Sequence, residues 1–330
     1  LIMTTYKDIR GTHIKTVTTD PPAPVNGQMW YNSTSQVMKG FTSNPGGAWS
    51  SGGALNTGRN ALMGAGTKTA ALAAGGTRPP AAFDTSTEEY DGTSWTTSGA
   101  LNTGRKLSGM GGTQTAGILS GGIKAPANTN SAENEYYNGS SWSEQTDLNE
   151  GRYGMGGAGT QTAMLIFGGV SFGASPVFTN KTELWNGSGW TETAEMNTAR
   201  HYIGSCGTST AALGCGSTNG HTETWNGSAW TEVADMNQIR STMKNAGSYT
   251  DCISFGGYFE PATSYVGSTE LYDGTSWTEI NDMSTGRGEM AAAKGGTSGS
   301  TLAAGGSPGA PTANEEFTRP ATSTVTFTAS

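Results

Sequence analysis

The chain has 330 residues, 51 of them glycine, and only 13% are charged. No apolar stretch approaches the length of a membrane-spanning helix, and a net charge of −8 argues against nucleic acid as a partner, because phosphate binding needs a basic face. A preference for Gly, Thr, Ser and Asn over helix formers leaves an all-β protein or a disordered chain, and nine Trp, eleven Tyr and nine Phe speak against disorder.

Residues 1–36 do not share the pattern of the rest of the chain. The start, LIMTTYKDIR, lacks the apolar segment of a secretory signal. Residues 20–24 (DPPAP) predict a stiff, extended linker, and residues 27–41 (GQMWYNSTSQVMKGF) indicate a strand, a turn and a second strand. We expect this part to be an extended arm that anchors the chain to other proteins.

From residue 37 to residue 320 the sequence repeats. Each unit places an arginine ten residues after a tryptophan, and a glutamate seven residues before the next tryptophan. The tryptophans are Trp49, Trp95, Trp142, Trp190, Trp230 and Trp277. The arginines are Arg59, Arg105, Arg152, Arg200, Arg240 and Arg287. The glutamates are Glu88, Glu135, Glu183, Glu223, Glu270 and, in the last unit, Glu315.

Each unit predicts four short strands. The first follows the arginine, the second ends at a Gly-Gly pair, the third carries the glutamate and the fourth starts at the tryptophan. An Asn-Gly or Asp-Gly dipeptide between the last two strands predicts a hairpin turn in which both residues have positive φ. Four-stranded units of this length are typical of β-propeller blades, with small residues on the crowded inner strand and the tryptophan between neighbouring blades.

The two ends of the repeat complement each other. The last unit lacks its tryptophan, and Trp49 lacks a preceding glutamate, since Thr42 stands there. We therefore expect an all-β, six-bladed propeller over residues 37–320, closed by pairing of the N- and C-terminal segments, with a tail at 321–330. The pattern resembles the kelch repeat, whose propellers include both enzymes and binding modules.

The repeated arginines favour an architectural interpretation. A feature present in every unit points to the common architecture, whereas function usually breaks the symmetry of a repeat. A glutamate or backbone carbonyls would neutralise each arginine. Function is expected where the repeat breaks, in the variable loops after the glycine pairs. Their aromatic residues are candidates for binding a glycan or a protein: Phe83, Phe172, Phe178, Tyr258, Phe259 and Tyr265.

The sequence predicts no catalysis, cofactor or metal site. Copper radical oxidases, which also have kelch-like propellers, need two His with Tyr and Cys, whereas His13, His201 and His221 lack a convincing third ligand. Cys206, Cys215 and Cys252 have no metal-binding spacing, and the pairing of Cys206 with Cys215 stays open. The NGS triplets at Asn138, Asn186 and Asn226 coincide with the hairpin turns and are interpreted as such.

The arm, with PPAPVNGQMWYN, resembles segments of tailed-phage structural proteins, and blades with DGTSWT look like kelch-type proteins of marine phages. The resemblance implies a virion protein on an extracellular particle, anchored to other virion proteins through residues 1–36, with the propeller displayed toward the host surface. The tail 321–330 is expected to add a strand to a neighbouring subunit, in a homo-oligomer within the particle. Two alternatives remain: a secreted bacterial carbohydrate-binding or glycan-modifying propeller, and a kelch-type adaptor for a protein partner.

Overall fold

The computed structural model describes residues 14–21, 28–42, 46–80, 82–126, 129–172, 176–309, 311–319 and 323–327. The chain divides into two compact units, one of residues 1–45 with 319–330 and one of residues 46–318. The described residues contain strands and a single 3-10 turn, η1 (Glu260–Ala262), so the predicted all-β class is confirmed. None of them belongs to a helix of the length and apolarity needed to cross a membrane.

The smaller unit is a four-stranded sheet in the order β1-β2-β3-β38. Its strands are β1 (Lys15–Val17), β2 (Met29–Asn32), β3 (Val37–Thr42) and β38 (Ser323–Phe327). The predicted strand–turn–strand over 27–41 is present as β2 and β3. The predicted boundary at residue 36 differs from the observed division, because β3 pairs with β2 on one side and β38 on the other. The tail strand β38 thus pairs with β3 of its own chain, and its pairing with a neighbouring subunit stays a prediction.

Asp20 joins the strands of the smaller unit. Its carboxylate accepts hydrogen bonds from the indole of buried Trp30 (3.0 Å), the amide of Asn32 (2.7 Å) and the ammonium of Lys39 (2.6 Å). These donors, led by Lys39, lower the pKa of Asp20 to about 2. Asp20 therefore has a structural role beyond starting the predicted linker, of which residues 22–24 lie outside the described part.

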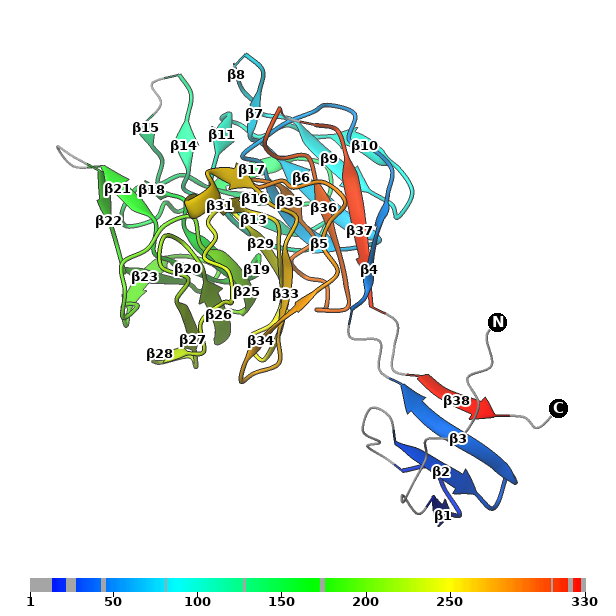
Figure 1. Cartoon of the computed structure of the whole chain (residues 1–330). Helices are drawn as coiled ribbons and strands as arrows, with labels where there is room; N and C mark the ends of the chain where they lie inside the picture. Colours follow the sequence, from blue (N-terminus) through cyan, green and yellow to red (C-terminus); the bar gives the residue numbers. More distant parts are fainter. Residues whose placement is uncertain are drawn as a thin grey trace. The chain divides into compact units, whose positions relative to one another are not determined.

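The described residues of the larger unit form six four-stranded antiparallel sheets, whose strands are labelled in Figure 1. Sheets 1 to 3 consist of β5 (Met63–Thr67), β6 (Ala70–Ala74), β9 (Thr87–Tyr90) and β10 (Trp95–Ser98); β12 (Gly109–Gly112), β13 (Gly117–Ser120), β16 (Asn134–Tyr137) and β17 (Trp142–Gln145); and β19 (Gly156–Thr160), β20 (Ala163–Phe167), β23 (Thr182–Trp185) and β24 (Trp190–Thr193). Sheets 4 to 6 consist of β25 (Gly204–Thr208), β26 (Ala211–Cys215), β27 (Thr222–Trp225) and β28 (Trp230–Val233); β29 (Lys244–Ser248), β30 (Asp251–Phe255), β33 (Thr269–Tyr272) and β34 (Trp277–Ile280); and β35 (Ala291–Ala292), β36 (Ser300–Ala304), β37 (Asn314–Thr318) and β4 (Ala48–Ser51).

Sheet 6 joins the two ends of the larger unit. Its fourth strand, β4, comes from the N-terminal side and pairs with β37, so that Trp49 lies opposite Phe317. The first strands of the sheets contact one another in the order β5, β12, β19, β25, β29 and β35, and β35 also contacts β5. This arrangement is compatible with the propeller that the sequence predicts.

The tryptophans fill the spaces between neighbouring sheets. Trp142 of sheet 2 packs in one cluster with Met63 and Leu72 of sheet 1, and its indole N–H donates to the hydroxyl of Thr87 at 2.9 Å. Equivalent indole bonds join Trp230 to Thr182, Trp277 to Thr222 and Trp49 to Thr269. Since burying one large apolar side chain contributes about 1.5–3 kcal/mol, a small set of such residues can hold thin sheets together.

The Asn-Gly and Asp-Gly turns differ from the prediction. Tyr90 pairs with Trp95, so the loop between them has four residues and not two. Gly92 has a φ of +95°, but Asp91 has no positive φ, because its carboxylate accepts hydrogen bonds from the N–H groups of Thr93 and Ser94 (both 2.8 Å) and fixes the loop from the side chain. The dipeptide therefore has a positive φ at one position, Gly92, instead of the two predicted.

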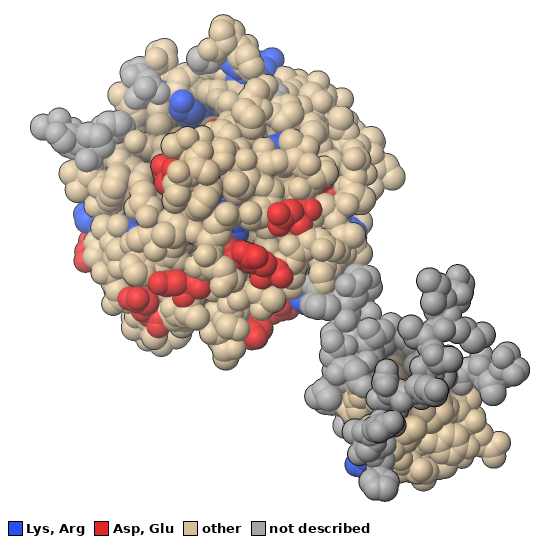
Figure 2. Space-filling model, viewed as in Figure 1, with Lys and Arg blue, Asp and Glu red and all other residues tan. Residues whose placement is uncertain are grey.

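The outer strands carry exposed acidic residues. Glu144, Glu192, Glu232 and Glu279 each stand two residues after the tryptophan that begins the strand and point to solvent. Figure 2 shows acidic side chains gathered over the lower part of the visible face of the larger unit. Charges on unpaired strand edges discourage edge-to-edge association.

Several variable loops fold into short hairpins. They contain β7 (Thr77–Arg78) with β8 (Ala82–Phe83), β14 (Ile123–Lys124) with β15 (Thr129–Asn130), β21 (Val170–Phe172) with β22 (Pro176–Phe178), and β31 (Tyr258–Phe259) with β32 (Ser264–Tyr265). The hairpins of β7–β8 and β14–β15 stand at the upper edge of the larger unit in Figure 1. Two of the hairpins pair with a short strand that begins at a repeated arginine. β14 pairs with β11 (Arg105–Lys106), and β21 pairs with β18 (Arg152–Tyr153). The loops and the residues just after the arginines therefore lie at the same end of the sheets.

Candidate functional site

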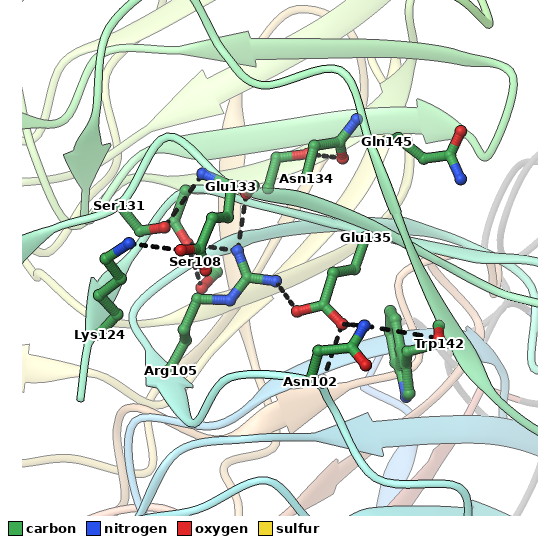
Figure 3. Close-up of polar contacts among 12 residues, drawn as sticks. Asn102, Arg105, Ser108, Lys124, Ser131, Glu133, Asn134, Glu135, Trp142 and Gln145 are labelled. Atoms are coloured by element: carbon green, nitrogen blue, oxygen red, sulfur yellow. Dashed lines mark hydrogen bonds and ion pairs between the residues drawn. The ribbon is translucent and has the colours of Figure 1, made fainter. Parts of the chain in front are cut away.

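The six repeated arginines are buried, and each pairs with the glutamate of its own unit at an N–O distance of 2.5–2.9 Å. In sheet 2 (Figure 3), Arg105 also donates to the carbonyl oxygen of Glu133, and Glu135 accepts from the backbone N–H of Asn102 at 3.0 Å. Burial lowers the pKa of Arg105 from its ordinary value, and the carboxylate of Glu135 opposes this effect. These contacts fit an architectural role and leave no ring of free cations at this position.

The same arginines connect neighbouring sheets through their backbone. The carbonyl oxygen of Arg105 accepts from the N–H of Gly76 in sheet 1 at 2.8 Å. Gly76 has a φ of +97°, and a Cβ there would lie 2.5 Å from the carbonyl oxygen of Asn60, which explains why glycine follows the second strand. Each arginine thus bonds to its own sheet by its side chain and to the preceding sheet by its carbonyl.

A ring of residues with positive φ lies two positions after the arginines. We call it the mouth ring: Ala61, Leu107, Gly154, Tyr202, Thr242 and Glu289, with φ between +51° and +65°. From Leu107 to Glu289, each N–H donates to the carbonyl oxygen of the preceding member at 2.6–3.2 Å. Left-handed conformations cost non-glycine residues about 1–2 kcal/mol, and the hydrogen bonds between members offset part of that cost.

The mouth ring surrounds one end of a row of cavities between the first strands, which we call the central channel. Four cavities that share lining residues have volumes of about 30, 30, 40 and 460 Å³ from the mouth ring toward the opposite end. Leu107, Tyr202, Thr242 and Glu289 line the first of them. The last and widest is lined mainly by the Gly-Thr turns between first and second strands, together with Tyr249.

Aromatic side chains form a stack beside the mouth ring. Phe178, about half exposed, stacks on His201 with ring centres 4.0 Å apart, and His201 contacts Tyr202 at 4.5 Å. Tyr153 lies 6.2 Å from Tyr202 on the other side. Burial lowers the pKa of His201 and raises that of Tyr202 to about 12, so both rings are neutral at physiological pH. We call Phe178, His201, Tyr202 and Tyr153 the aromatic stack.

A second aromatic pair approaches the same mouth. Tyr258 and Tyr265 lie 5.2 Å apart, and the ring of Tyr265 leaves no room for a side chain at Gly288, since a Cβ there would lie 2.9 Å from it. Burial and the nearby charge of Glu289 raise the pKa of Tyr265. Glu289 accepts from the hydroxyl of Ser307 at 2.7 Å and supplies the acidic group of the mouth.

Of the predicted binding residues, Phe178 belongs to the aromatic stack, and Tyr258 and Tyr265 form the pair next to Gly288. Phe83 lies apart on the β7–β8 hairpin, where the ammonium of Lys106 lies 5.3 Å from its ring centre. Phe259 is on the β31–β32 hairpin, and the side chain of Phe172 lies outside the described residues. The sequence interpretation did not place Tyr153, His201 and Tyr202 together beside the loop aromatics. The sequence marks these three residues only by their position. Each is the first or second residue after a repeated arginine, where other units carry smaller or different residues.

Two lysines of the central channel were also missed. Lys244 and Lys294 follow their arginines by four and seven residues, on the inner strand and its turn. The prediction that small residues fill this crowded region fails at both positions. Their side chains line the channel, although neither metal-ligand chemistry nor aromatic character marks them in the sequence.

His221 contacts two acidic residues outside the mouth ring. His221 lies on the outer side of sheet 4 with its Nδ1 3.4 Å from Asp235 and 3.6 Å from Glu232, a partly exposed trio of metal-ligand types. Lys181 occupies the equivalent place in sheet 3 and pairs with Glu192 in the same way, so we interpret the trio as a surface charge contact. His13 lies outside the described residues.

All three cysteines are buried thiols. Cys206 forms no disulfide with Cys215, and its sulfur instead lies 2.7 Å from that of Cys252 in the neighbouring sheet.

No protein-family model matches the chain, and no curated protein matches it.

Proposed function

We propose that residues 46–318 form a six-bladed β-propeller of kelch-like blades. Six sheets of equal strand order, the cyclic contacts of their first strands and the pairing of β4 with β37 support this architecture. Removing residues 1–52 takes away β4 and exposes the edge of β37, so we expect aggregation in size-exclusion chromatography. Removing residues 1–36 leaves β4 in place and serves as the control; a monodisperse, equally stable 53–330 protein would refute ring closure by β4.

We further propose that the protein is a non-catalytic binding module whose ligand lies across the channel mouth. The observation that carries this proposal is that departures from the repeat gather at one end, as the aromatic stack, the Tyr258–Tyr265 pair and Glu289. Neutral, partly exposed aromatic faces stack well against the apolar faces of sugar rings, and a carboxylate accepts hydrogen bonds from sugar hydroxyls. We therefore favour a host-surface glycan as the ligand, with a protein surface as the alternative.

The setting that we propose is the particle of a tailed phage. The resemblance of residues 1–36 and of the blades to phage structural proteins supports it, and the smaller unit is a compact body separate from the blades. The propeller then faces the host. In this setting the protein is part of the extracellular virion and acts in attachment.

The binding proposal is tested on a glycan array and on host cells. We expect saccharide binding that falls at least tenfold in Phe178→Ala, because the outer face of the aromatic stack is lost. Tyr249→Ala removes a comparably exposed aromatic residue at the opposite channel end and should bind normally. Equal binding by both variants would contradict the assignment of the mouth. For the particle setting, unchanged incorporation of a 37–330 protein into virions would contradict the anchor.

The same variants and assays distinguish two other functions. A secreted bacterial carbohydrate-binding or glycan-modifying propeller would bind saccharides without entering particles, and turnover of a saccharide substrate would refute the non-catalytic assignment. A kelch-type adaptor would bind a protein through the mouth, would not respond to saccharides and would still lose binding in Phe178→Ala.

A further inference from the structure

Lys244 and Lys294 break the repeat inside the central channel. The place of Lys294 holds a glycine of positive φ in each of the other five units: Gly66, Gly112, Gly159, Gly207 and Gly247. The place of Lys244 holds Met63, Gly109, Gly156, Gly204 or Ala291. The architecture therefore does not require a charge at either position, and their presence calls for another explanation.

The two ammonium groups have different surroundings. The Nζ of Lys294 donates to the carbonyl oxygens of Gly157 (2.7 Å) and Met110 (3.4 Å) and to the hydroxyl of Ser205 (2.8 Å), which belong to three different sheets. The Nζ of Lys244 has no hydrogen bond or ion pair with any residue in the described ranges, and its side chain lines the cavities on both sides of it. Lys244 thus brings an ammonium with free N–H donors to the channel.

The cavity that both lysines line contains no carboxylate among its described lining residues. Asn245 is fully buried in its wall, with its Nδ2 3.1 Å from the sulfur of Cys215 and its Oδ1 without a partner. The amide of Asn245 can also be turned over, because the thiol of Cys215 can donate to Oδ1; the NH₂ group then faces the cavity. The acidic group nearest along the channel, Glu289, lines the mouth above and bonds to Ser307.

Two cations in one narrow cavity that has no carboxylate among its described lining residues are costly. Burial lowers the pKa of Lys244 to about 8, although the charge of Glu289 in the neighbouring cavity opposes this effect. Burial together with the charge of Lys244 lowers the pKa of Lys294 to about 7. An anion beside both groups would reduce this cost, because an opposite charge favours the charged form of each lysine. The residues present fit such an ion, since an ammonium and an adjustable amide are both hydrogen-bond donors.

The size of the cavity selects the anion. Its volume of about 30 Å³ has room for roughly two water molecules, which is too little for phosphate or sulfate and enough for a halide. We propose that the cavity between Lys244 and Lys294 is a binding site for a small monovalent anion of the size of chloride. The site lies below the mouth and does not depend on the proposed ligand of the aromatic stack.

The test compares thermal unfolding of the full chain in sodium chloride and in sodium gluconate of equal ionic strength, since gluconate is too large to enter. We expect a higher Tm in chloride for the wild-type protein, and a chloride affinity at least tenfold weaker in Lys244→Met. Lys181→Met removes an equal charge from the outer surface and is expected to keep the chloride effect. An absent chloride effect in the wild type, or an equal effect in Lys244→Met, would overturn the proposal.

A second measurement keeps the proposal testable if Lys244→Met does not fold. Wild-type crystals soaked in sodium bromide should show one anomalous peak within hydrogen-bonding distance of the Nζ of Lys244. Bromide sites confined to the outer surface would overturn the proposal. Glycan binding is measured separately with Phe178→Ala, so a failure of the anion site is distinguishable from a failure of the mouth.

Discussion

Replacing Glu135 by glutamine tests whether the buried arginine–glutamate pairs hold the sheets. Arg105 and Glu135 are both less than 2% exposed, so neither side chain can exchange its partner for water. The other oxygen of Glu135 accepts from the backbone and side-chain amides of Asn102, at 3.0 and 2.8 Å. A glutamine keeps the shape but turns an NH₂ group toward one of these donors. Because breaking a buried pair typically costs 3–5 kcal/mol, we expect a loss of about that size in Glu135→Gln.

The assay is urea unfolding followed by tryptophan fluorescence, together with a double-mutant cycle. Arg105→Met should also cost about 3–5 kcal/mol, since it leaves a buried carboxylate with Asn102 alone. The double variant should be more stable than the sum of the single losses predicts, by roughly 1–3 kcal/mol, because neither uncompensated charge remains.

Lys181→Met, which breaks an exposed pair, is the control and should cost about 0–1 kcal/mol. A Glu135→Gln loss no larger than this control, or strict additivity in the cycle, would refute the reasoning. The contacts of Glu183 with Arg152 and Asn149 repeat those of Glu135, so Glu183→Gln should give a loss of the same size.

Three further predictions concern single residues. The three cysteines should not react with a thiol reagent until the protein unfolds, because burial raises the pKa of Cys215 to about 12 and that of Cys252 well above its ordinary value; rapid labelling of the native protein would contradict this. In chloride-free buffer, the folded pKa of Lys244, about 8, lies below its unfolded value of 10.5, so the unfolded chain binds more protons between these pH values. The unfolding free energy of the wild type should therefore rise from pH 8 to 10.5 relative to that of Lys244→Met. Below pH 8, Lys244→Met should be more stable than the wild type by about 3 kcal/mol. A difference between the two proteins that does not change with pH would contradict this. Thr242→Gly should raise stability by about 1 kcal/mol in urea unfolding, because it relieves a β-branched residue at φ +57° and removes a buried hydroxyl without a partner; a loss would show that other contacts of Thr242 dominate.

The strand order of the larger unit could be predicted because the repeat fixes offsets. Tryptophan at the start of a strand and glutamate seven residues before it place two paired strands in each unit, as Tyr137 opposite Trp142 shows. The pairing of β4 with β37 followed from two incomplete units. The smaller unit could not be predicted in this way, since neither β3 nor β38 contains a tryptophan, arginine or glutamate of the repeat, and the two strands are far apart in the sequence.

Part of the candidate site was accessible for a similar reason. The loop aromatics were selected because loops vary; Phe178 stacks on His201, and Tyr265 lies against Gly288, each next to a member of the mouth ring. His201 was weighed from the sequence only as a metal ligand, and Tyr202 was not selected because it stands inside the repeat, where regularity is interpreted as architecture. Comparing side chains place by place along the units shows Tyr202, Lys244 and Lys294 as departures too.

Regular backbone and irregular side chains have separate roles in this chain. The mouth ring is held by backbone hydrogen bonds, from the N–H of Leu107 onward, and these bonds do not depend on what side chain each member carries. Six successive places can therefore hold alanine, leucine, glycine, tyrosine, threonine and glutamate without changing the ring. The same holds for the inner strands, where the backbone pairing that accommodates a glycine also accommodates Lys244. A scaffold fixed by its backbone is free to change its chemistry at the places that face the channel, which is why function is to be sought in the side chains that differ between units.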